Sequence, residues 1–351
     1  MSKKREEIDF NAYNLRPAGS YLDGIADSIN DFSELLKAMN MADDAAKQML
    51  EETAEKKNPM LEKTAPKTQA EESEDTPDLD ELLAELDALV GLDKIKADVK
   101  SLINLVKIRK LREEYGLASP AMSLHLVFMG NPGTGKTTVA RLVAQLYRAI
   151  GVLSKGQLIE VDRSGLVAGY VGQTAIKTGE VIQKALGGVL FIDEAYALAT
   201  RSDGQQADFG QEAIDTILKA MEDNRRDFVV IVAGYEELME RFISSNPGLE
   251  SRFNKYFLFD DYTGEELYKI FLSFCKKNEY ALEEAAEQAA EAHFKMLYET
   301  RDENFGNARD VRNLFEKVVS AHADRVAALE APEKDDLITV LAEDFEKATL
   351  M

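Results

Sequence analysis

Residues 130–138 read Gly130-Asn131-Pro132-Gly133-Thr134-Gly135-Lys136-Thr137-Thr138, and they follow directly on the apolar run 124–129. This stretch matches the phosphate-binding pattern G-x-x-x-x-G-K-[ST] in its proper setting, after a strand-like segment and before a helix-like one. Its three glycines let successive backbone N–H groups turn inward around phosphate oxygens. The helix expected from about Lys136 points its positive N-terminal end at the same place.

The side chains of this loop indicate a nucleoside triphosphate with magnesium. We expect Lys136 to reach the β- and γ-phosphates and the hydroxyl of Thr137 to coordinate Mg²⁺. A glycine-rich turn with a coincidental lysine is the alternative, which the strand–loop–helix setting disfavours. The rest of the expected nucleotide-binding loop comprises Asn131, Pro132, Gly133, Thr134, Gly135 and Thr138.

A second apolar run, 189–192, ends in the carboxylates Asp193 and Glu194. Four apolar residues in a row fit a parallel strand covered on both faces, and the carboxyl end of such a strand opens into the ligand crevice of an α/β sheet. We expect Asp193 to join the magnesium shell through water and Glu194 to act as general base on the attacking water. A helix N-cap followed by a first-turn acid is the better interpretation of an isolated pair, but not opposite a phosphate loop.

Composition limits the classes of protein that the chain can represent. The net charge is −22, of which residues 1–90 carry −12, and so acidic a chain is poorly suited to nucleic acid. The only cysteine, Cys275, excludes an internal disulfide and fits a reducing cytosol. With neither a long apolar run nor a secretory leader pattern at the N-terminus, we expect a cytoplasmic protein without a membrane span. Three scattered histidines offer no metal-ligand spacing.

The first 80 residues differ in composition from the rest of the chain. Residues 1–59 predict a small helical module, in which 28–41 carries a short apolar face at helical spacing. That face is either a docking surface for a partner or the inside of a small bundle. Residues 60–80 are charged, poor in apolar residues and proline-containing, which predicts an acidic disordered linker.

The remainder predicts an α/β domain over 81–262 and an all-α segment over 263–351. Apolar strand-like runs alternate with helix-like segments, which indicates a parallel sheet with helices on both faces. From residue 263 onward the pattern is helical only, in a small separate bundle. The expected strands lie at 124–129, 158–161, 189–192, 228–233 and 256–259, with a glycine-rich loop at 164–173.

An α/β core with both motifs, followed at once by a helical lid, resembles the AAA+ ATPases, which have a P-loop NTPase core. The match covers roughly 80–349. The run 90–92 resembles the segment that covers the adenine in these proteins, which implies that Gly91 binds nucleotide. The run 208–235 is similar to one branch, the stage V sporulation protein K-like ATPases and red-type rubisco activases. This resemblance implies ATP and Mg²⁺ as cofactors and ATP hydrolysis as the reaction.

The same resemblance assigns roles to arginines. Residues 246–253 resemble the stretch that holds the arginine finger, which implies that Arg252 completes a neighbouring subunit's site in a ring-shaped homo-oligomer, expected as a hexamer. A surface salt bridge or helix cap is the alternative. Residues 306–312 resemble the lid motif whose arginine touches the γ-phosphate. That match favours Arg309, with Arg312 as the alternative.

One departure concerns the residue that helps to place the attacking water. Many AAA+ proteins have Asn or Thr at the end of the strand corresponding to 228–233, whereas here the strand runs into Gly234 and Tyr235. Tyr235 or a nearby polar residue such as Asn246 is a candidate substitute.

The loop that contains Tyr170, Val171 and Gly172 resembles the central-pore loop of protein-threading rings. A tyrosine offers a large apolar contact to any polypeptide, and flanking glycines let such a loop move. The alternative for Tyr170 is a core tyrosine in a tight turn. The motif favours an ATP-driven remodeller of a protein client over an assembly switch that recruits a partner through the N-terminal module. The charge of −22 disfavours a DNA-directed ATPase.

Overall fold

A computed structural model describes residues 78–119, 122–170, 172–199, 209–302 and 305–350. The expected N-terminal module lies outside these ranges, and so does the expected linker except for its last three residues. Of those three, Asp78 precedes helix α2 (Leu79–Ala88), and Leu79 and Asp80 belong to it. In the part of the chain described, no helix is long and apolar enough to cross a membrane.

A five-stranded parallel sheet forms the centre of the α/β part, in the order β2-β3-β4-β1-β5. In register, Phe128 of β1 lies opposite Ala233 of β4 on one side and Phe257 of β5 on the other. The expected parallel sheet is therefore confirmed. The strands are β1 (Leu126–Gly130), β2 (Leu158–Val161), β3 (Val189–Ile192), β4 (Val229–Gly234) and β5 (Tyr256–Phe259).

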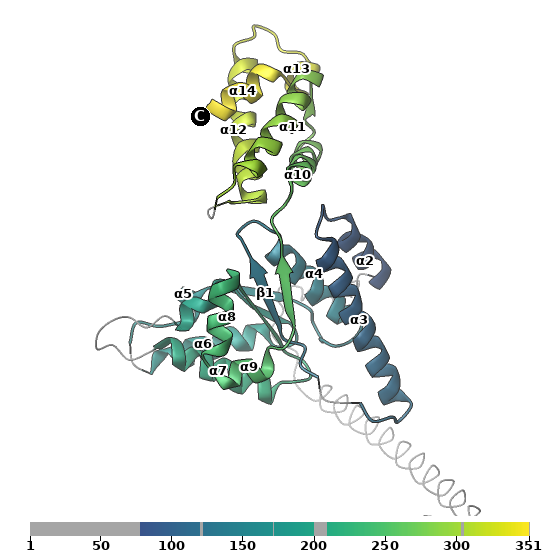
Figure 1. The fold of residues 1–351 in the computed structure, drawn as a ribbon, viewed down its shortest axis with the longest axis vertical. Helices are drawn as coiled ribbons and strands as arrows, with labels where there is room; N and C mark the ends of the chain where they lie inside the picture. Colours follow the sequence, from purple (N-terminus) through teal and green to yellow (C-terminus); the bar gives the residue numbers. More distant parts are fainter. Residues whose placement is uncertain (1–77, 120–121, 171, 200–208, 303–304, 351) are drawn as a thin grey trace, which may run out of the picture. The chain divides into compact units, whose positions relative to one another are not determined.

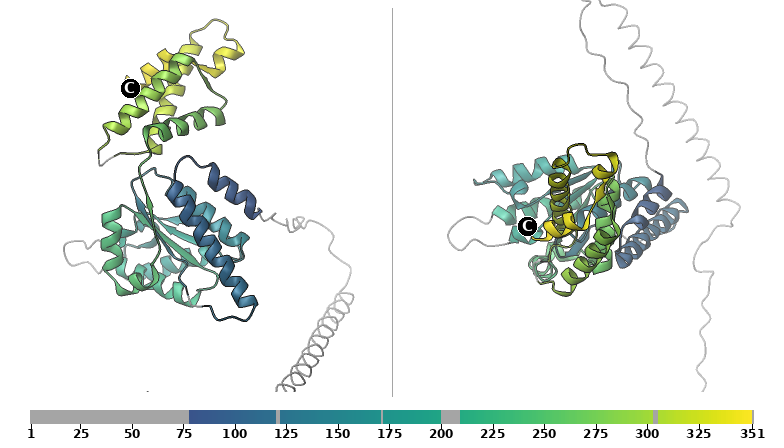
Figure 2. Two further views of the ribbon diagram at one scale, coloured as in Figure 1. Left: turned by 45° about the vertical axis from the view of Figure 1, so that its right-hand side comes forward. Right: turned by 90° about the horizontal axis from the view of Figure 1, so that it is seen from above.

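Helices cover both faces of the sheet, as Figure 1 and Figure 2 show. Because successive side chains of a strand point to opposite faces, Phe128 joins one buried cluster and its neighbour Val127 joins the other. The first cluster contains residues of α2, α3 (Asp93–Glu114) and α4 (Lys136–Ala149). Against the other face pack α5 (Arg163–Leu166), α6 (Gln173–Ala185), the 3₁₀ helix η2 (Ala195–Ala199), α7 (Phe209–Asp223), α8 (Glu236–Ser244) and α9 (Pro247–Arg252).

The segment after β5 is a helical lid with its own apolar core around Phe271, Phe294 and Phe345. A capping box between Thr263 and Glu266 begins its first helix. The lid helices are α10 (Gly264–Lys277), α11 (Glu284–Glu299), α12 (Ala308–Ala327), α13 (Lys334–Ile338) and α14 (Ala342–Leu350).

The expectation of helices alone from residue 263 is wrong at one place. Strands β6 (Ala281–Leu282) and β7 (Thr339–Val340) form a parallel pair within the lid. The pair is anchored because Val340 is buried and its carbonyl accepts the N–H of Glu283 at 3.0 Å. Two-residue strands are too short to give an alternating pattern in the sequence.

The expected loop at 164–173 also begins differently, because its first residues belong to the short helix α5. The side chain of Asp162 caps that helix by accepting the N–H of Gly165 at 3.0 Å. Between β4 and β5, where we predicted no helices, α8 and α9 form the crossover that joins two parallel strands of the same sheet.

A buried histidine predicts acid sensitivity of the fold. Nδ1 of His125 accepts the backbone N–H of Val230 at 3.0 Å, which requires an unprotonated nitrogen. Burial, and secondarily the charge of Arg252, lower the pKa of His125 from 6.5 to about 4. As the pH falls through 6.5, His125 therefore becomes protonated in the unfolded chain but stays neutral in the folded chain. Stability from this residue is complete above pH 6.5 and declines as the pH falls toward 4.

We expect the difference in unfolding free energy between the wild type and His125→Asn to shrink by about 2 kcal/mol from pH 7 to pH 5. Asparagine keeps an oxygen acceptor at this place but does not titrate. Urea unfolding at both pH values measures the difference. An equal loss in both proteins would show that His125 is not the source.

Candidate functional site

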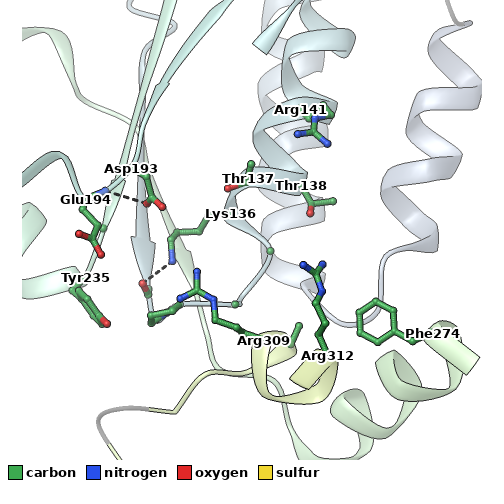
Figure 3. A pocket seen from close by; sticks show the side chains of 16 residues that line it. Lys136, Thr137, Thr138, Arg141, Asp193, Glu194, Tyr235, Phe274, Arg309 and Arg312 are labelled. Carbon is green, nitrogen blue, oxygen red and sulfur yellow. Dashed lines mark hydrogen bonds between the residues drawn. The ribbon is translucent and has the colours of Figure 1, made fainter. Parts of the chain in front are cut away.

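A cavity of about 470 Å³ opens at the carboxyl edge of the sheet, where three adjacent strands end. Gly130 ends β1, Gly234 ends β4, and Asp193 follows β3; all three line the cavity. Since β4 lies between β1 and β3, the sheet order itself brings the phosphate loop and the acidic pair to one place. Figure 3 shows the side chains that surround it.

Lys136 lines the cavity. Its Nζ donates to the carbonyl oxygens of Gly130 at 2.8 Å and Asn131 at 2.7 Å. Burial lowers the pKa of Lys136 from 10.5 to about 8, an effect that the carboxylate of Asp193 opposes and the guanidinium of Arg309 reinforces. A polyanion in the cavity would favour the charged form and raise this pKa again.

The other loop residues divide into two groups. Pro132, Gly133, Gly135, Thr137 and Thr138 line the cavity with Lys136. By contrast, the loop's remaining two side chains shape its backbone. The hydroxyl of Thr134 donates to the carbonyl of Asn131 at 2.8 Å, and the amide of Asn131 donates to Asp261 at 2.9 Å.

Asp193 and Glu194 face the cavity from the end of β3. Oδ1 of Asp193 accepts the backbone N–H of Glu194 at 3.0 Å, which fixes the pair relative to each other. Glu194 has a positive φ of 48°, a conformation that residues other than glycine adopt uncommonly and that is often found at active sites. Glu194 is exposed to solvent.

The oxygen donors present fit magnesium brought in by a phosphate. Within the described ranges, no group of three or more His, Cys, Asp or Glu residues is arranged to hold a metal ion by itself. Mg²⁺ commonly binds through one or two protein oxygens together with phosphate oxygens and water. Thr137, whose hydroxyl lies 3.5 Å from Oε1 of Glu160, and Asp193 offer such oxygens at the cavity.

Four residues of the lid line one side of the cavity. Ala308, Arg309 and Arg312 belong to α12, and Phe274 belongs to α10. Figure 3 shows Arg309 beside Lys136, and the guanidinium of Arg312 lies 5.9 Å from the ring centre of Phe274. Both arginines offered by the sequence are therefore present at the cavity.

The cavity is positively charged within an acidic chain. Arg141, which the sequence analysis missed, lies one turn after Thr137 on α4, so the i,i+4 spacing could have found it. Phe274 left no comparable signal, since it belongs to the lid. The charged lining comprises four cations (Lys136, Arg141, Arg309 and Arg312) against two carboxylates (Asp193 and Glu194).

The structure places Tyr235 at the cavity but not Asn246 or Gly91, the other residues that we considered for the site. Tyr235 lines the cavity, whereas Asn246 caps helix α9 by accepting the N–H of Gly248 at 2.8 Å. Gly91 is not part of the cavity lining; a Cβ added to it would lie 2.2 Å from Oε1 of Glu266 in the lid. Within one chain, Gly91 therefore marks a close approach between the α/β part and the lid.

Arg252 lies apart from this cavity. It lines a second, smaller cavity of about 230 Å³, together with His125 and Arg225. Its Nη2 lies 3.0 Å from Oε2 of Glu222, and its Nη1 donates to the carbonyl of Gly248 at 3.3 Å. The structure of a single chain therefore does not bring Arg252 to the phosphate loop.

Tyr170 projects into solvent with 73% of its surface exposed, so the alternative of a core tyrosine is wrong. Helix α6 anchors the backbone before it. The hydroxyl of Thr174 accepts the N–H of Ala168 at 3.1 Å, and Lys177 donates to the carbonyl of Val167 at 3.0 Å. Gly172 caps the helix, and Val171 lies outside the described residues.

Comparisons with known proteins agree with this architecture. The model of the ATPase family associated with various cellular activities (AAA) matches residues 126–261, and that of the AAA lid domain matches 263–351. Stage V sporulation protein K of Bacillus subtilis is 43% identical over 268 residues, covering 76% of this chain and 82% of the relative. The chloroplastic ribulose bisphosphate carboxylase/oxygenase activase of Cyanidioschyzon merolae is 42% identical over 275 residues, covering 78% and 92%.

A solved RuvB variant from Thermotoga maritima has a TM-score of 0.51 at 19% identity, covering 76% of this chain and 71% of that one. At this identity the likeness concerns the fold alone.

The lowered pKa of Lys136 predicts that nucleotide affinity depends on pH. Binding needs the charged ammonium, so above pH 8 each binding event must take up a proton. We expect the Kd for a fluorescent ADP analogue to rise roughly tenfold between pH 7 and pH 9 in the wild type. In Lys136→Arg the guanidinium stays charged and the slope should be flat, whatever the absolute affinity. Equal slopes would contradict this account.

Proposed function

The chain belongs to the AAA ATPase family, and from that premise we propose that it binds Mg-ATP in the cavity at the phosphate loop, works as a ring-shaped homo-oligomer and remodels or threads a protein client. It is an ATP hydrolase of the branch that includes stage V sporulation protein K and the rubisco activases. The observation that carries the proposal is the meeting of Lys136, Asp193, Glu194 and Arg309 at one cavity.

Each of these side chains has a distinct part in hydrolysis. Lys136 and the loop N–H groups bind the β- and γ-phosphates, and Arg309 reaches the γ-phosphate from the lid. Thr137 and Asp193 hold the site for Mg²⁺, which when bound neutralises charge on the phosphate oxygens. Glu194 orients a water molecule and takes its proton. Tyr235, at the end of β4, is placed to help position that water.

The position of Arg252 supports an oligomeric site. An arginine matches the geometry of phosphate oxygens and stays charged, yet Arg252 lies away from its own chain's cavity. We infer that it acts on the nucleotide of a neighbouring subunit and that closing the ring, expected as a hexamer, completes every site. Within the single chain the guanidinium pairs with Glu222 instead.

The position of Tyr170 supports threading over a simple assembly switch. An anchored loop that exposes an aromatic ring to solvent suits contact with a passing polypeptide, whereas a switch has no need for it. The relatives' names refer to sporulation in one case and to ribulose bisphosphate carboxylase/oxygenase in another. The client that we propose here is defined only by its chemistry, as a polypeptide segment with apolar side chains.

A mixing experiment tests the shared site. Arg252→Ala alone should lose about a thousandfold or more in kcat while still binding ATP, because the finger acts mainly on the transition state. Mixed with Glu194→Gln, which lacks the base but keeps Arg252, it should regain activity, because a subunit with intact Glu194 then receives the arginine of its neighbour. Arg241→Ala, which removes another exposed surface arginine, is the matched control and should keep the wild-type kcat. A mixture as inactive as either variant alone would place the arginine's action within its own chain.

Replacing Tyr170 tests the threading step. With casein as an unfolded polypeptide probe, we expect the wild type to hydrolyse ATP faster than without it. Tyr170→Ala should keep the basal rate of hydrolysis, because Tyr170 does not line the nucleotide cavity. It should lose the stimulation by casein, because the aromatic contact with the polypeptide is gone. Tyr170→Phe, which keeps the ring, should retain it. Equal stimulation in all three proteins, or none in the wild type, would contradict threading through this loop.

A further inference from the structure

Asn307 is a fully buried side chain to which the hydrolysis scheme assigns no part. Its Nδ2 donates to Oδ1 of Asp261 at 2.8 Å and lies 3.3 Å from the carbonyl oxygen of Pro132 in the phosphate loop. Its Oδ1 accepts the backbone N–H of Tyr262 at 2.8 Å. Oδ1 of Asp261 also accepts from the amide of Asn131 at 2.9 Å. One carboxylate oxygen thus joins the phosphate loop to the residue that precedes α12.

The backbone of Asn307 has a conformation that is unfavourable for any residue with a side chain. Its φ of 52° and ψ of −129° lie outside the left-handed helical region that asparagine tolerates. Glycine would adopt this conformation without strain. The side-chain bonds to Asp261 and Tyr262 therefore hold Asn307 in place against the preference of its own backbone.

Two backbone carbonyls of the phosphate loop accept further hydrogen bonds. The N–H of Ala308 donates to the carbonyl of Gly133 at 3.2 Å, and the hydroxyl of Tyr262 donates to the carbonyl of Thr134 at 3.3 Å. A Cβ added to Gly133 would lie 2.1 Å from the carbonyl oxygen of Gly306. Four consecutive loop residues, 131–134, are therefore hydrogen-bonded either to residues 261–262, just before the lid, or to residues 307–308, at the start of α12.

We propose that Asn307, held by Asp261, is a positioning residue that couples the phosphate loop to the lid. Arg309 follows Asn307 by two residues and Arg312 by five, so any displacement of the loop by phosphate moves the start of α12 and both guanidinium groups with it. The inference rests on the nucleotide site proposed above. It adds the contact through which bound nucleotide determines the position of the lid.

The coupling predicts a loss of turnover that exceeds any loss of binding. Asn307→Gly keeps the backbone conformation but removes the amide. We expect kcat to fall at least about tenfold, since Arg309 is no longer placed by the loop. The Kd for a fluorescent ADP analogue should stay within about threefold, which also shows that the variant is folded. Glu279→Gly, at another lid position with positive φ, is the matched control and should change neither value.

A double-mutant cycle tests the contact with Asp261 itself. Asp261→Ala removes the oxygen that accepts from both Asn307 and Asn131 and should lower kcat at least about tenfold. Because both residues act through this one contact, Asn307→Gly combined with Asp261→Ala should stay within about threefold of the slower single variant. Losses in kcat that multiply in the double variant would overturn the proposal, because they would show that the two residues act independently.

Fluorescence gives a direct readout of the lid. The chain contains no tryptophan, so Phe274→Trp places a single probe on the lid wall of the cavity. We expect ADP to change its emission, and Asn307→Gly in the same background to bind the ADP analogue without that change. If this double variant showed the same emission change and the same kcat as Phe274→Trp, the coupling would be overturned but the nucleotide site would not. Binding that is insensitive to Lys136→Ala would overturn the nucleotide site, and the coupling with it.

Discussion

The contact between the phosphate loop and the first turn of α12 is the constraint on which the site depends. There is no room for a side chain at Gly133, because the carbonyl of Gly306 occupies the space where a Cβ would lie. The lid has its own apolar core, but the residues at the start of α12 form one hydrogen-bonded structure with the loop. Arg309 and Arg312 of the cavity lie in the first two turns of the same helix. Nucleotide binding and lid position are therefore parts of a single equilibrium.

The cavity has the opposite charge from the chain as a whole. A net charge of −22 keeps the surface acidic, whereas the cavity gathers four cations around two carboxylates. Burial lowers the pKa of Lys136, which means that its charged form is disfavoured in the cavity. A polyphosphate beside it would stabilise the charged form. The site is in this way prepared for a polyanion rather than neutralised by internal ion pairs.

The acidic pair and the exposed loop are connected through the sheet. The N–H of Asp193 donates to the carbonyl of Val161 at 2.8 Å, so the ladder between β3 and β2 extends to the edge of the cavity. From Val161 the chain passes through the short helix α5 to the loop that exposes Tyr170. In the proposed remodeller, this continuous bonded route leads from the place of hydrolysis to the place where a client is held.

The sequence alone was sufficient to predict the five strands, the phosphate loop and the Asp193–Glu194 pair, because each depends on local pattern. A buried parallel strand needs a continuous apolar run, and the loop needs glycines and a lysine at fixed spacing. The β6–β7 pair, Phe274, and the junction of Asp261 with Asn307 left no such pattern. Asn307 and Asp261 are 46 residues apart, and Asn307 and Pro132 are 175 apart. Only the packing of the lid against the loop brings those groups within hydrogen-bond distance, and tertiary structure therefore decided how the lid is joined to the site.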